Sequence, residues 1–308
     1  MKRIEFKIIK DNSYANEINE ILAEEEMDSL LKIKYIKYPD LFHSLERDGI
    51  KPPIIVVGID KENDNIVGVG ACTVLEGEIG YLNSFRIRKS YRNKVKFSEA
   101  YRKLIEESRK SGIKKIVTTI LSENKAAEKI LTRQRKNMPI YEFLKNINFY
   151  SIKNRNKGKL SIDDEYIAIY KDMEIHIKKK ENKIYVAEDY KKIYSFLYRI
   201  RKIISFLGYP ELPEKGKKLN FLYAEVYSER RNRKIFLEAI KYLQNMGLDC
   251  DFFMMGAYED TFSDKVLSSL KSFKYKSRLY KVYYRDEEKY TDDPVLENLE
   301  IKFKLWNL

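Results

Sequence analysis

The chain has 308 residues, of which 44% are hydrophobic and 13% aromatic, and it carries a formal net charge of +13. Its length and apolar content suit two domains of ordinary size better than one, and no run approaches the 18 apolar residues of a membrane span. Only two histidines and two cysteines are present. This scarcity argues against a metal site and against nucleophilic triads that need a histidine base.

The two cysteines, Cys72 and Cys250, lie far apart inside apolar runs. Buried thiols in a reducing cytosol explain this placement better than a disulfide does. Behind Met1 the sequence alternates apolar and polar residues and then turns polar, which is typical of a strand and not of a signal peptide. We therefore expect a cytoplasmic protein that uses no metal and is not inserted in a membrane.

The basic charge raises two alternatives, a nucleic acid or a small anionic molecule as partner. The 47 acidic residues are mixed with the basic ones almost everywhere, and the chain has no long basic tail. The sequence therefore favours an anionic small molecule over a nucleic acid.

The first 150 residues predict an alternation of strands and helices. Ser111-Gly112 should stop one helix, and Ser122 or Asn124 should cap the next. Apolar periodicity places strands at residues 4–8, about 53–61, 65–75, 79–88, 114–121 and 147–152, and helices within 14–48, over 97–110 and around 126–131. This order indicates an α/β (α+β) fold in which helices flank a mixed sheet.

The second half repeats this order. Residues 153–182 are polar and lysine-rich, which indicates a hairpin and linker with a domain boundary near residue 172. Beyond it, helices are expected at 188–207, 235–246 and 263–270, and strands at 219–227, 250–258 and 276–284. Gly247 should end the middle helix. We therefore predict two domains, residues 1–172 and 173–308.

Several stretches carry a resemblance to a known family: "DLFHSLERDG" (40–49), "GYLNSFRIRKSYRNK" (80–94), "TTILSENKAAEKILTRQRKNMPIYEFL" (118–144), "LPEKGKKLNFLYAEVY" (212–227) and "FKYKSRLYKVYY" (273–284). With these, the chain resembles the GNAT N-acetyltransferase superfamily, and in particular bacterial proteins with two such domains in tandem. The resemblance implies two GNAT-like domains, each a mixed, mostly antiparallel sheet flanked by helices. It also implies acetyl-CoA as co-substrate and an amine acceptor, either a small molecule or a peptide.

The loop before the expected helix at residue 97 is the candidate phosphate site. In the family, the equivalent loop binds the pyrophosphate of acetyl-CoA, because backbone N–H groups at a helix N-terminus attract phosphate oxygens. Here Arg92 fits the first position of the family pattern, but Val95 and Phe97 occupy its glycine positions. The resemblance assigns cofactor contacts to Phe85, Arg86, Ile87, Arg92, Asn93, Lys94, Val95, Lys96, Phe97 and Asn124.

Two interpretations of this loop stay open. In the first, its N–H groups bind phosphate without glycine, and the charges of Arg92, Lys94 and Lys96 add to the binding. In the second, Phe97 simply begins the apolar stripe of the helix and the cations are a solvated surface. The second interpretation leaves a domain that binds no cofactor.

Acetyl transfer needs a base for the amine and benefits from an acid for the departing thiolate. The resemblance points to Glu78 as the base, because it lies just before the strand at 79–88; the alternative is that "EGE" is an exposed turn. Family members often carry a tyrosine seven residues after the helix asparagine, where this chain has Leu131. Tyr141 is the nearest replacement as acid, and its alternative role is packing beside Pro139.

The sequence is compatible with three functions. The first is an acetyl-CoA-dependent N-acetyltransferase whose acceptor the sequence does not identify. The second is a catalytically degenerate GNAT-fold protein that binds a CoA ester or a partner without turnover. The third, nucleic-acid binding, has the weakest support.

Overall fold

The computed structural model describes residues 4–24, 31–92, 95, 97–191, 193–228 and 231–286. Helices and strands of the first half are β1 (Ile4–Ile9), α1 (Ala15–Ala23), β2 (Leu31–Lys37), α2 (Leu41–Asp48), β3 (Lys51–Asp60), β4 (Asn65–Leu75), β5 (Ile79–Ile87), the 3-10 helix η1 (Lys89–Tyr91), α3 (Ser98–Lys110), β6 (Lys115–Leu121), α4 (Lys125–Thr132) and β7 (Ile140–Lys153). Those of the second half are β8 (Glu165–Tyr170), β9 (Met173–Lys178), β10 (Lys183–Tyr190), α5 (Ile193–Arg199), α6 (Arg201–Phe206), β11 (Phe221–Ser228), α7 (Arg233–Gln244), β12 (Phe252–Tyr258), α8 (Phe262–Leu267) and β13 (Ser272–Tyr283).

One large mixed sheet organises the molecule. Its eleven strands run in the order β1-β3-β4-β5-β6-β13-β7-β12-β11-β9-β8, and most neighbours are antiparallel. Two pairs are parallel, β5 with β6 and β11 with β12. The predicted α/β class, with a mostly antiparallel sheet flanked by helices, is confirmed.

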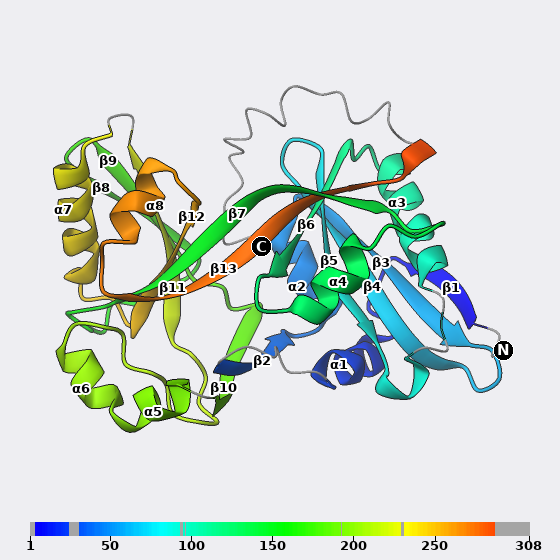
Figure 1. The fold of residues 1–308 in the computed structure, drawn as a ribbon, viewed down its shortest axis with the longest axis horizontal. Helices are drawn as coiled ribbons and strands as arrows, with labels where there is room; N and C mark the ends of the chain where they lie inside the picture. The colour runs from blue at the N-terminus through cyan, green and yellow to red at the C-terminus, as the bar shows by residue number, and fades with distance from the viewer. Residues whose placement is uncertain are drawn as a thin grey trace.

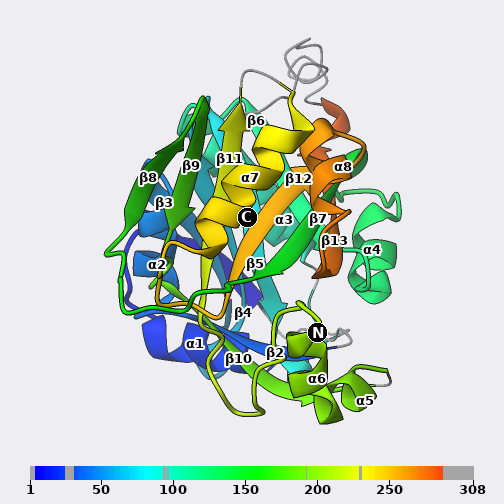
Figure 2. The same ribbon diagram turned by 90° about the vertical axis from the view of Figure 1, so that its left-hand side faces the viewer.

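Helices cover the two ends of the sheet separately. In the first half, α1 and α2 pack on one face of β3 and β4 and α3 packs on the other, so both strands are almost fully buried. In the second half, α7 and α8 cover β9, β11 and β12, as Figure 2 shows. Each half therefore has its own hydrophobic core.

Both halves contain a pair of parallel strands that pair over a short stretch and then separate. β5 pairs with β6 only over Ile79–Tyr81, and β11 pairs with β12 only over Phe221–Tyr223. The helix that connects each pair ends shortly before a glycine at positive φ, Gly112 (85°) after α3 and Gly247 (74°) after α7. The two predicted helix stops are confirmed, because glycine adopts this conformation without steric penalty.

The two halves share their central strands. β7 pairs with β13 from Ile140 to Ile152, and the same two strands then join opposite halves, β13 to β6 and β7 to β12. Figure 1 shows β7 and β13 side by side as one long ribbon across the molecule. The last described strand of the chain is thus built into the sheet of the first half. The predicted division after residue 172 lies in the turn between β8 and β9.

A second sheet corrects two helix predictions. Residues 31–37, expected to be helical, form β2. Residues 188–190, the expected start of a long helix, are the end of β10, and the two strands pair antiparallel. The remainder of that expected helix is divided into α5 and α6 at Ile200. Pairing between segments 150 residues apart overrides the local helical spacing, because strand partners are supplied by the tertiary fold.

A third core joins the halves beneath this small sheet. It consists of side chains from the central strands: Leu75, Ile79, Tyr81, Val117, Ile147, Phe149, Phe252, Met254 and Leu279. Both halves contribute to it, so the contact between them is apolar and continuous with the sheet. Among the described helices, none has the length and apolar character needed to cross a membrane.

Candidate functional site

The separation of β5 from β6 is the central feature of the candidate site. Backbone pairing ends at Tyr81 and Val117, and side chains replace it beyond that point. Thr118 Oγ1 donates a hydrogen bond to the Leu82 carbonyl oxygen at 2.8 Å, and the hydroxyl groups of Tyr81 and Thr119 lie 2.7 Å apart. From residue 83 onward, the described structure gives β5 no strand partner on the side that faces β6.

A bulge distorts β5 just beyond the separation. The register between β4 and β5 shifts after Val69, and Ser84 has a positive φ of 58°. Opposite the bulge, a Cβ on Gly70 would lie 2.5 Å from the Phe85 ring, so glycine is what lets that ring pack there. A bulge leaves one residue out of the ladder, and its backbone groups become available to other partners.

Phe85, Arg86 and Ile87, for which the resemblance implies contacts with the cofactor, lie along this open edge. Arg86 and Ile87 pair with Val69 and Gly68 of β4. The other edge of the strand therefore faces β6. The Phe85 ring stacks on Tyr101 at 4.2 Å, inside the core. Arg86 donates to the Phe85 carbonyl oxygen at 3.0 Å, and burial lowers the pKa of its guanidinium.

The N-terminus of α3 follows directly from this strand. Phe97 is its N-cap residue and offers no side-chain oxygen, so the first-turn N–H groups receive no cap of this kind. The Phe97 ring points into the core, 5.7 Å from Phe6, and would clash at 2.7 Å with a Cβ on Gly68. Phenylalanine at a glycine position of the family pattern therefore fills a space beside another glycine, Gly68, and does not cap the first turn of α3.

The remaining loop residues are partly described. Arg92 is exposed and ends η1, and Val95 packs against the core beneath α3. Asn93, Lys94 and Lys96 lie outside the described residues. Two anchors hold the start of the loop, and the sequence reading missed both. Tyr91 donates to buried Asp60 at 2.7 Å, and Arg88 pairs with Glu20 and Glu24 of the α1 region.

Glu78 lies away from the separated strands. It has a positive φ of 59° in the turn before β5, its side chain is 55% exposed, and it pairs with Lys114 at 2.8 Å. The Glu78 carbonyl oxygen accepts from the Lys114 backbone at the end where β5 and β6 are still joined. The structure does not bring Glu78 to the open edge, which begins beyond Tyr81 of the same strand.

Tyr141 is partly buried at the start of β7, on the α3 side of the sheet. Its ring packs at right angles to Tyr101 and Tyr280, and its hydroxyl shares a hydrogen bond with that of Tyr101. Burial raises the pKa of Tyr141 well above its usual range, so the phenol stays protonated. Tyr101 also stacks on Phe85, so the Tyr101 ring lies between Tyr141 and the bulged strand.

Asn124 has a local structural role. Its side chain accepts a hydrogen bond from the Ala127 backbone N–H at 3.0 Å and caps α4. Of the two caps that the sequence allowed, Asn124 is the one used. α4 lies beside the start of β7, where Glu128 accepts a hydrogen bond from the Tyr280 hydroxyl at 3.1 Å.

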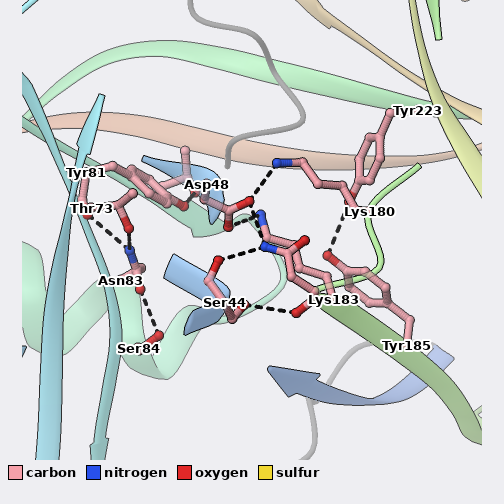
Figure 3. A network of polar contacts seen from close by, with 12 residues as sticks. Ser44, Asp48, Thr73, Tyr81, Asn83, Ser84, Lys180, Lys183, Tyr185 and Tyr223 are labelled. Carbon is pink, nitrogen blue, oxygen red and sulfur yellow. Dashed lines mark hydrogen bonds and ion pairs between the residues drawn. The ribbon is translucent and has the colours of Figure 1, made fainter. Parts of the chain in front are cut away.

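Polar side chains gather on the face of β5 opposite α3. Asn83 donates to Thr73 Oγ1 at 2.9 Å and accepts from Ser84 Oγ at 2.7 Å (Figure 3). Tyr81 lies on the same face, in the core shared by the halves. The sequence reading assigned no role to these residues, although "YLNSF" interrupts an otherwise apolar strand with two neighbouring polar residues.

Asp48 is the centre of a buried charged cluster beside this face. Lys180 and Lys183 contact its two carboxylate oxygens at 2.6 and 3.0 Å, and Asn182 donates to it at 3.0 Å (Figure 3). Ser44 links the same turn to α2 by donating to the Asn182 carbonyl oxygen. Asp48 ends α2 in the first half, whereas both lysines flank the connection from β9 to β10, so the cluster joins the two halves.

The charges of this cluster are strongly perturbed. Burial opposes ionisation of Asp48, but the charges of Lys183, Lys180 and Lys37 outweigh it and hold its pKa well below the usual range. Burial lowers the pKa of Lys37 to about 7 and that of Lys180 to about 8. For Lys183 burial acts in the same direction, but the charge of Asp48 prevails and raises its pKa.

In the second half, a side chain caps the first turn of the corresponding helix, α7. The Asn232 side chain accepts from the backbone N–H groups of Lys234 and Ile235, so it already occupies the first turn of α7. Arg231 and Arg233 are exposed. Within the described part of the chain, no group of three or more His, Cys, Asp or Glu side chains is placed to hold a metal ion.

Comparison with known proteins gives one family match. Residues 16–134 match the model of the acetyltransferase (GNAT) family. This range runs from α1 to just past α4 and includes the separated strands, the bulge and the N-terminus of α3. No curated protein matches the chain.

Solved structures of acetyltransferases are among the matches to this chain. A tandem GNAT protein from the clavulanic acid biosynthesis pathway is 8% identical, with 91% of this chain and 98% of that chain covered and a TM-score of 0.46. A GNAT-family acetyltransferase from Staphylococcus aureus Mu50 is 20% identical, with 48% and 86% covered and a TM-score of 0.34. A GCN5-related N-acetyltransferase from Kribbella flavida is 8% identical, with 90% and 71% covered and a TM-score of 0.41.

Proposed function

Because residues 16–134 form a domain of the acetyltransferase (GNAT) family, we propose that this protein transfers an acetyl group from acetyl-CoA to an amine. The observation that carries the proposal is the separation of β5 from β6, with a bulge at Ser84 and, next in the chain, the N-terminus of α3, whose N-cap residue Phe97 makes no side-chain cap. These three features lie in the half that matches the family.

The residues present fit acetyl-CoA. The edge of β5 from residue 83 to residue 87, beyond its pairing with β6, offers backbone groups to the amides of the pantetheine arm in the manner of an added strand, apart from the Phe85 carbonyl oxygen, which accepts from Arg86. The N-terminus of α3 offers its first-turn N–H groups and its positive dipole end to the pyrophosphate, with exposed Arg92 nearby in the chain. The side chains of Phe85 and Phe97 point into the core, so neither needs to move for these backbone contacts.

Acetyl-CoA supplies an acetyl group activated as a thioester. In the transfer, the amine nitrogen bonds to the acyl carbon and the carbon–sulfur bond breaks, while the amine loses one proton and the thiolate takes up one. The backbone released by the bulge at Ser84 is placed to orient the acyl carbonyl, because its groups are not engaged in the ladder. Tyr141 stays protonated and is the candidate donor to the thiolate.

The alternative is a GNAT-fold protein that binds a CoA ester without turnover. The position of Glu78 favours this alternative, since the expected base is exposed and paired with Lys114 at the joined end of the strands. Deprotonation of a lysine-like amine at pH 7 requires roughly 4–5 kcal/mol, so turnover without a base within reach of the amine would be markedly slower. Release of free thiol from acetyl-CoA in the presence of an amine panel distinguishes the two.

Binding is tested by thermal unfolding with acetyl-CoA. A ligand at 100 times its dissociation constant adds about 2.7 kcal/mol to the free energy of unfolding, which is a readily measured increase in Tm. Arg92→Ala should weaken binding about tenfold, equivalent to ~1.4 kcal/mol, because an exposed charge contributes at the lower end of the range for charged hydrogen bonds.

Arg231→Ala is the matched control. Arg231 is an exposed arginine before α7, whose first turn is already capped by Asn232, so its loss should leave acetyl-CoA binding unchanged. If the Tm does not change at millimolar acetyl-CoA, the proposal fails. If Arg231→Ala weakens binding and Arg92→Ala does not, the site belongs to the second half.

A further inference from the structure

Three lysines and one aspartate are buried together between the two halves. Lys37 is 7% exposed, and the side chains of Lys180, Lys183 and Asp48 are 5%, 2% and 2% exposed. With every amine protonated, this cluster carries two more positive charges than negative ones. Like charges in the interior are strongly unfavourable unless anionic groups accompany them.

Lys37 is the lysine that the aspartate does not satisfy. Asp48 already accepts from Lys180, Lys183 and Asn182. Within the described residues, Lys37 Nζ makes no hydrogen bond or ion pair, and its recorded contact is with the ring of Tyr35, 5.3 Å from the centroid. A cross-link between α2 and the β9–β10 connection is complete without it, so holding the halves together does not explain Lys37.

Tyrosines surround the cluster. Tyr35 stacks on Tyr185 at 4.9 Å, and the hydroxyl of Tyr185 lies 3.2 Å from that of Tyr223 (Figure 3). Tyr81, the last residue of β5 before the strands separate, belongs to the same core as Tyr223 and lies beside Asp48 in Figure 3. The cationic cluster and the open edge of β5 therefore lie close together, on the face of the sheet that carries Asn83.

We propose that the acceptor is an amine that also carries an anionic group, a carboxylate or a phosphate, and that Lys37, Lys180 and Lys183 bind that group. This inference rests on the proposed acetyl transfer and names the substrate class of the same site. The anionic group neutralises the excess charge of the lysines, the tyrosine rings pack against the stem of the acceptor, and the amine reaches the thioester beside Tyr81 and Ser84. The lysine pair on Asp48 positions the anion, and Lys37 completes its coordination.

The test compares matched amines as acceptors in an assay of thiol release from acetyl-CoA. The pairs are 5-aminovalerate with pentylamine, tyrosine with tyramine, and O-phosphoethanolamine with ethanolamine. In at least one pair the anionic member should have a kcat/KM at least about tenfold higher, the effect of one charged contact. The first two pairs report on a carboxylate, and the third reports on a phosphate.

Lys37→Met should remove this preference. It should lower kcat/KM about tenfold for the amine with the anionic group and less than about twofold for the matched amine that lacks this group. Lys179→Met is the control. Lys179 is next to Lys180 in the sequence, but its side chain is 42% exposed and paired with Glu181. That control should keep the wild-type preference. Equal kcat/KM within every pair that turns over, or an equal loss on both members in Lys37→Met, would overturn the inference.

Binding without acetyl-CoA separates this inference from the proposed function. The Tm of the wild type should rise with the preferred anionic amine, and the increase should be lost in Lys37→Met. If no amine turns over but this pattern is found, acetyl transfer fails and the anion site stands. If amines turn over without any preference for an anionic group, the transferase stands and the anion site fails. If neither turnover nor a Tm change is found, both fail.

Discussion

At the scale of single residues, Lys37 has the clearest thermodynamic signature. Burial lowers its pKa to about 7, with repulsion from Lys183 acting in the same direction, whereas the ordinary pKa of lysine is 10.5. Between these two values the unfolded chain binds more protons than the folded protein. The free energy of unfolding therefore rises with pH across this window, and the full penalty of the buried ammonium applies below about pH 7.

Lys37→Met should remove most of this pH dependence. The wild type should gain up to ~1.4 kcal/mol of unfolding free energy per pH unit and per group above pH 7, and Lys180, with a pKa of about 8, adds its share at higher pH. The variant should be more stable than the wild type by about 1–4 kcal/mol at pH 6, with the difference narrowing toward pH 9. Urea unfolding from pH 6 to pH 9 measures the free energy of unfolding of both proteins. If the two free energies change with pH in the same way, Lys37 is not a buried ammonium with a lowered pKa.

Glu78→Gln should leave turnover nearly unchanged. The Glu78 side chain is 55% exposed and its ion pair with Lys114 is on the surface, so its loss should change stability by less than about 1 kcal/mol. With the amine panel above, kcat/KM should stay within about twofold of the wild type, since a base acts only within hydrogen-bond reach of its proton. A loss of a hundredfold or more would restore Glu78 as the base.

At the scale of elements, the bulge in β5 depends on glycines in the neighbouring strand. Gly70 gives the Phe85 ring its place, and Gly68 does the same for Phe97 at the start of α3. Both aromatic rings belong to the core beneath α3. Packing on one face of the sheet thus fixes the position of the open strand edge and of the helix N-terminus.

Gly70→Ala should damage both stability and ligand binding. The new Cβ would lie 2.5 Å from the Phe85 ring, so the ring must leave its stacked position on Tyr101, and overpacking of this kind destabilises by about 1–3 kcal/mol. Affinity for acetyl-CoA should fall as well, because the bulge moves with Phe85. Calorimetric titration and thermal unfolding report the two effects.

Gly112→Ala provides the comparison for that variant. Its Cβ would meet nothing within 4 Å, but its φ of 85° is unfavourable for alanine, so it should lose about 1–2 kcal/mol of stability. Affinity for acetyl-CoA should be retained, because Gly112 lies at the far end of α3. If both variants lose affinity in proportion to stability, the bulge has no specific role in binding.

At the scale of the whole molecule, the central strands make the two halves dependent on each other. β13 lies between β6 and β7, and β7 lies between β13 and β12. Each half therefore completes its sheet with a strand from the other part of the chain. The buried contact of Asp48 with Lys180 and Lys183 adds a second connection on one face.

Neither predicted domain should fold when expressed alone. Residues 1–172 lack β13 and would expose the edges of β6 and β7, and residues 173–308 lack β7. Thermal unfolding of each fragment should show no cooperative transition, whereas co-expression should yield a folded complex. Replacement of the second fragment by residues 173–270, which lack β13, should abolish the complex. A cooperative transition in residues 1–172 alone would show that the first half is independent.

The sequence by itself determined the class of fold and most of its elements. Apolar periodicity located α3, α7 and the central strands, and positive-φ glycines at 112 and 247 ended the helices, because these signals are local. The family resemblance pointed to the strand at 79–88 and the loop after it; the structure shows that this strand separates from β6 beyond Tyr81, and the binding of a cofactor there stays a prediction.

Only the tertiary structure decided the pairing and the environment of the charged residues. "KIKYIK" at 32–37 alternates as a strand, but its partner, β10, lies 150 residues away. Likewise, Asp48, Lys37, Lys180 and Lys183 are ordinary charged residues in a lysine-rich chain, and no local pattern distinguishes them from the many exposed ones. Their pKa values and their proposed role follow from burial and proximity, which arise only when segments distant in the sequence pack together.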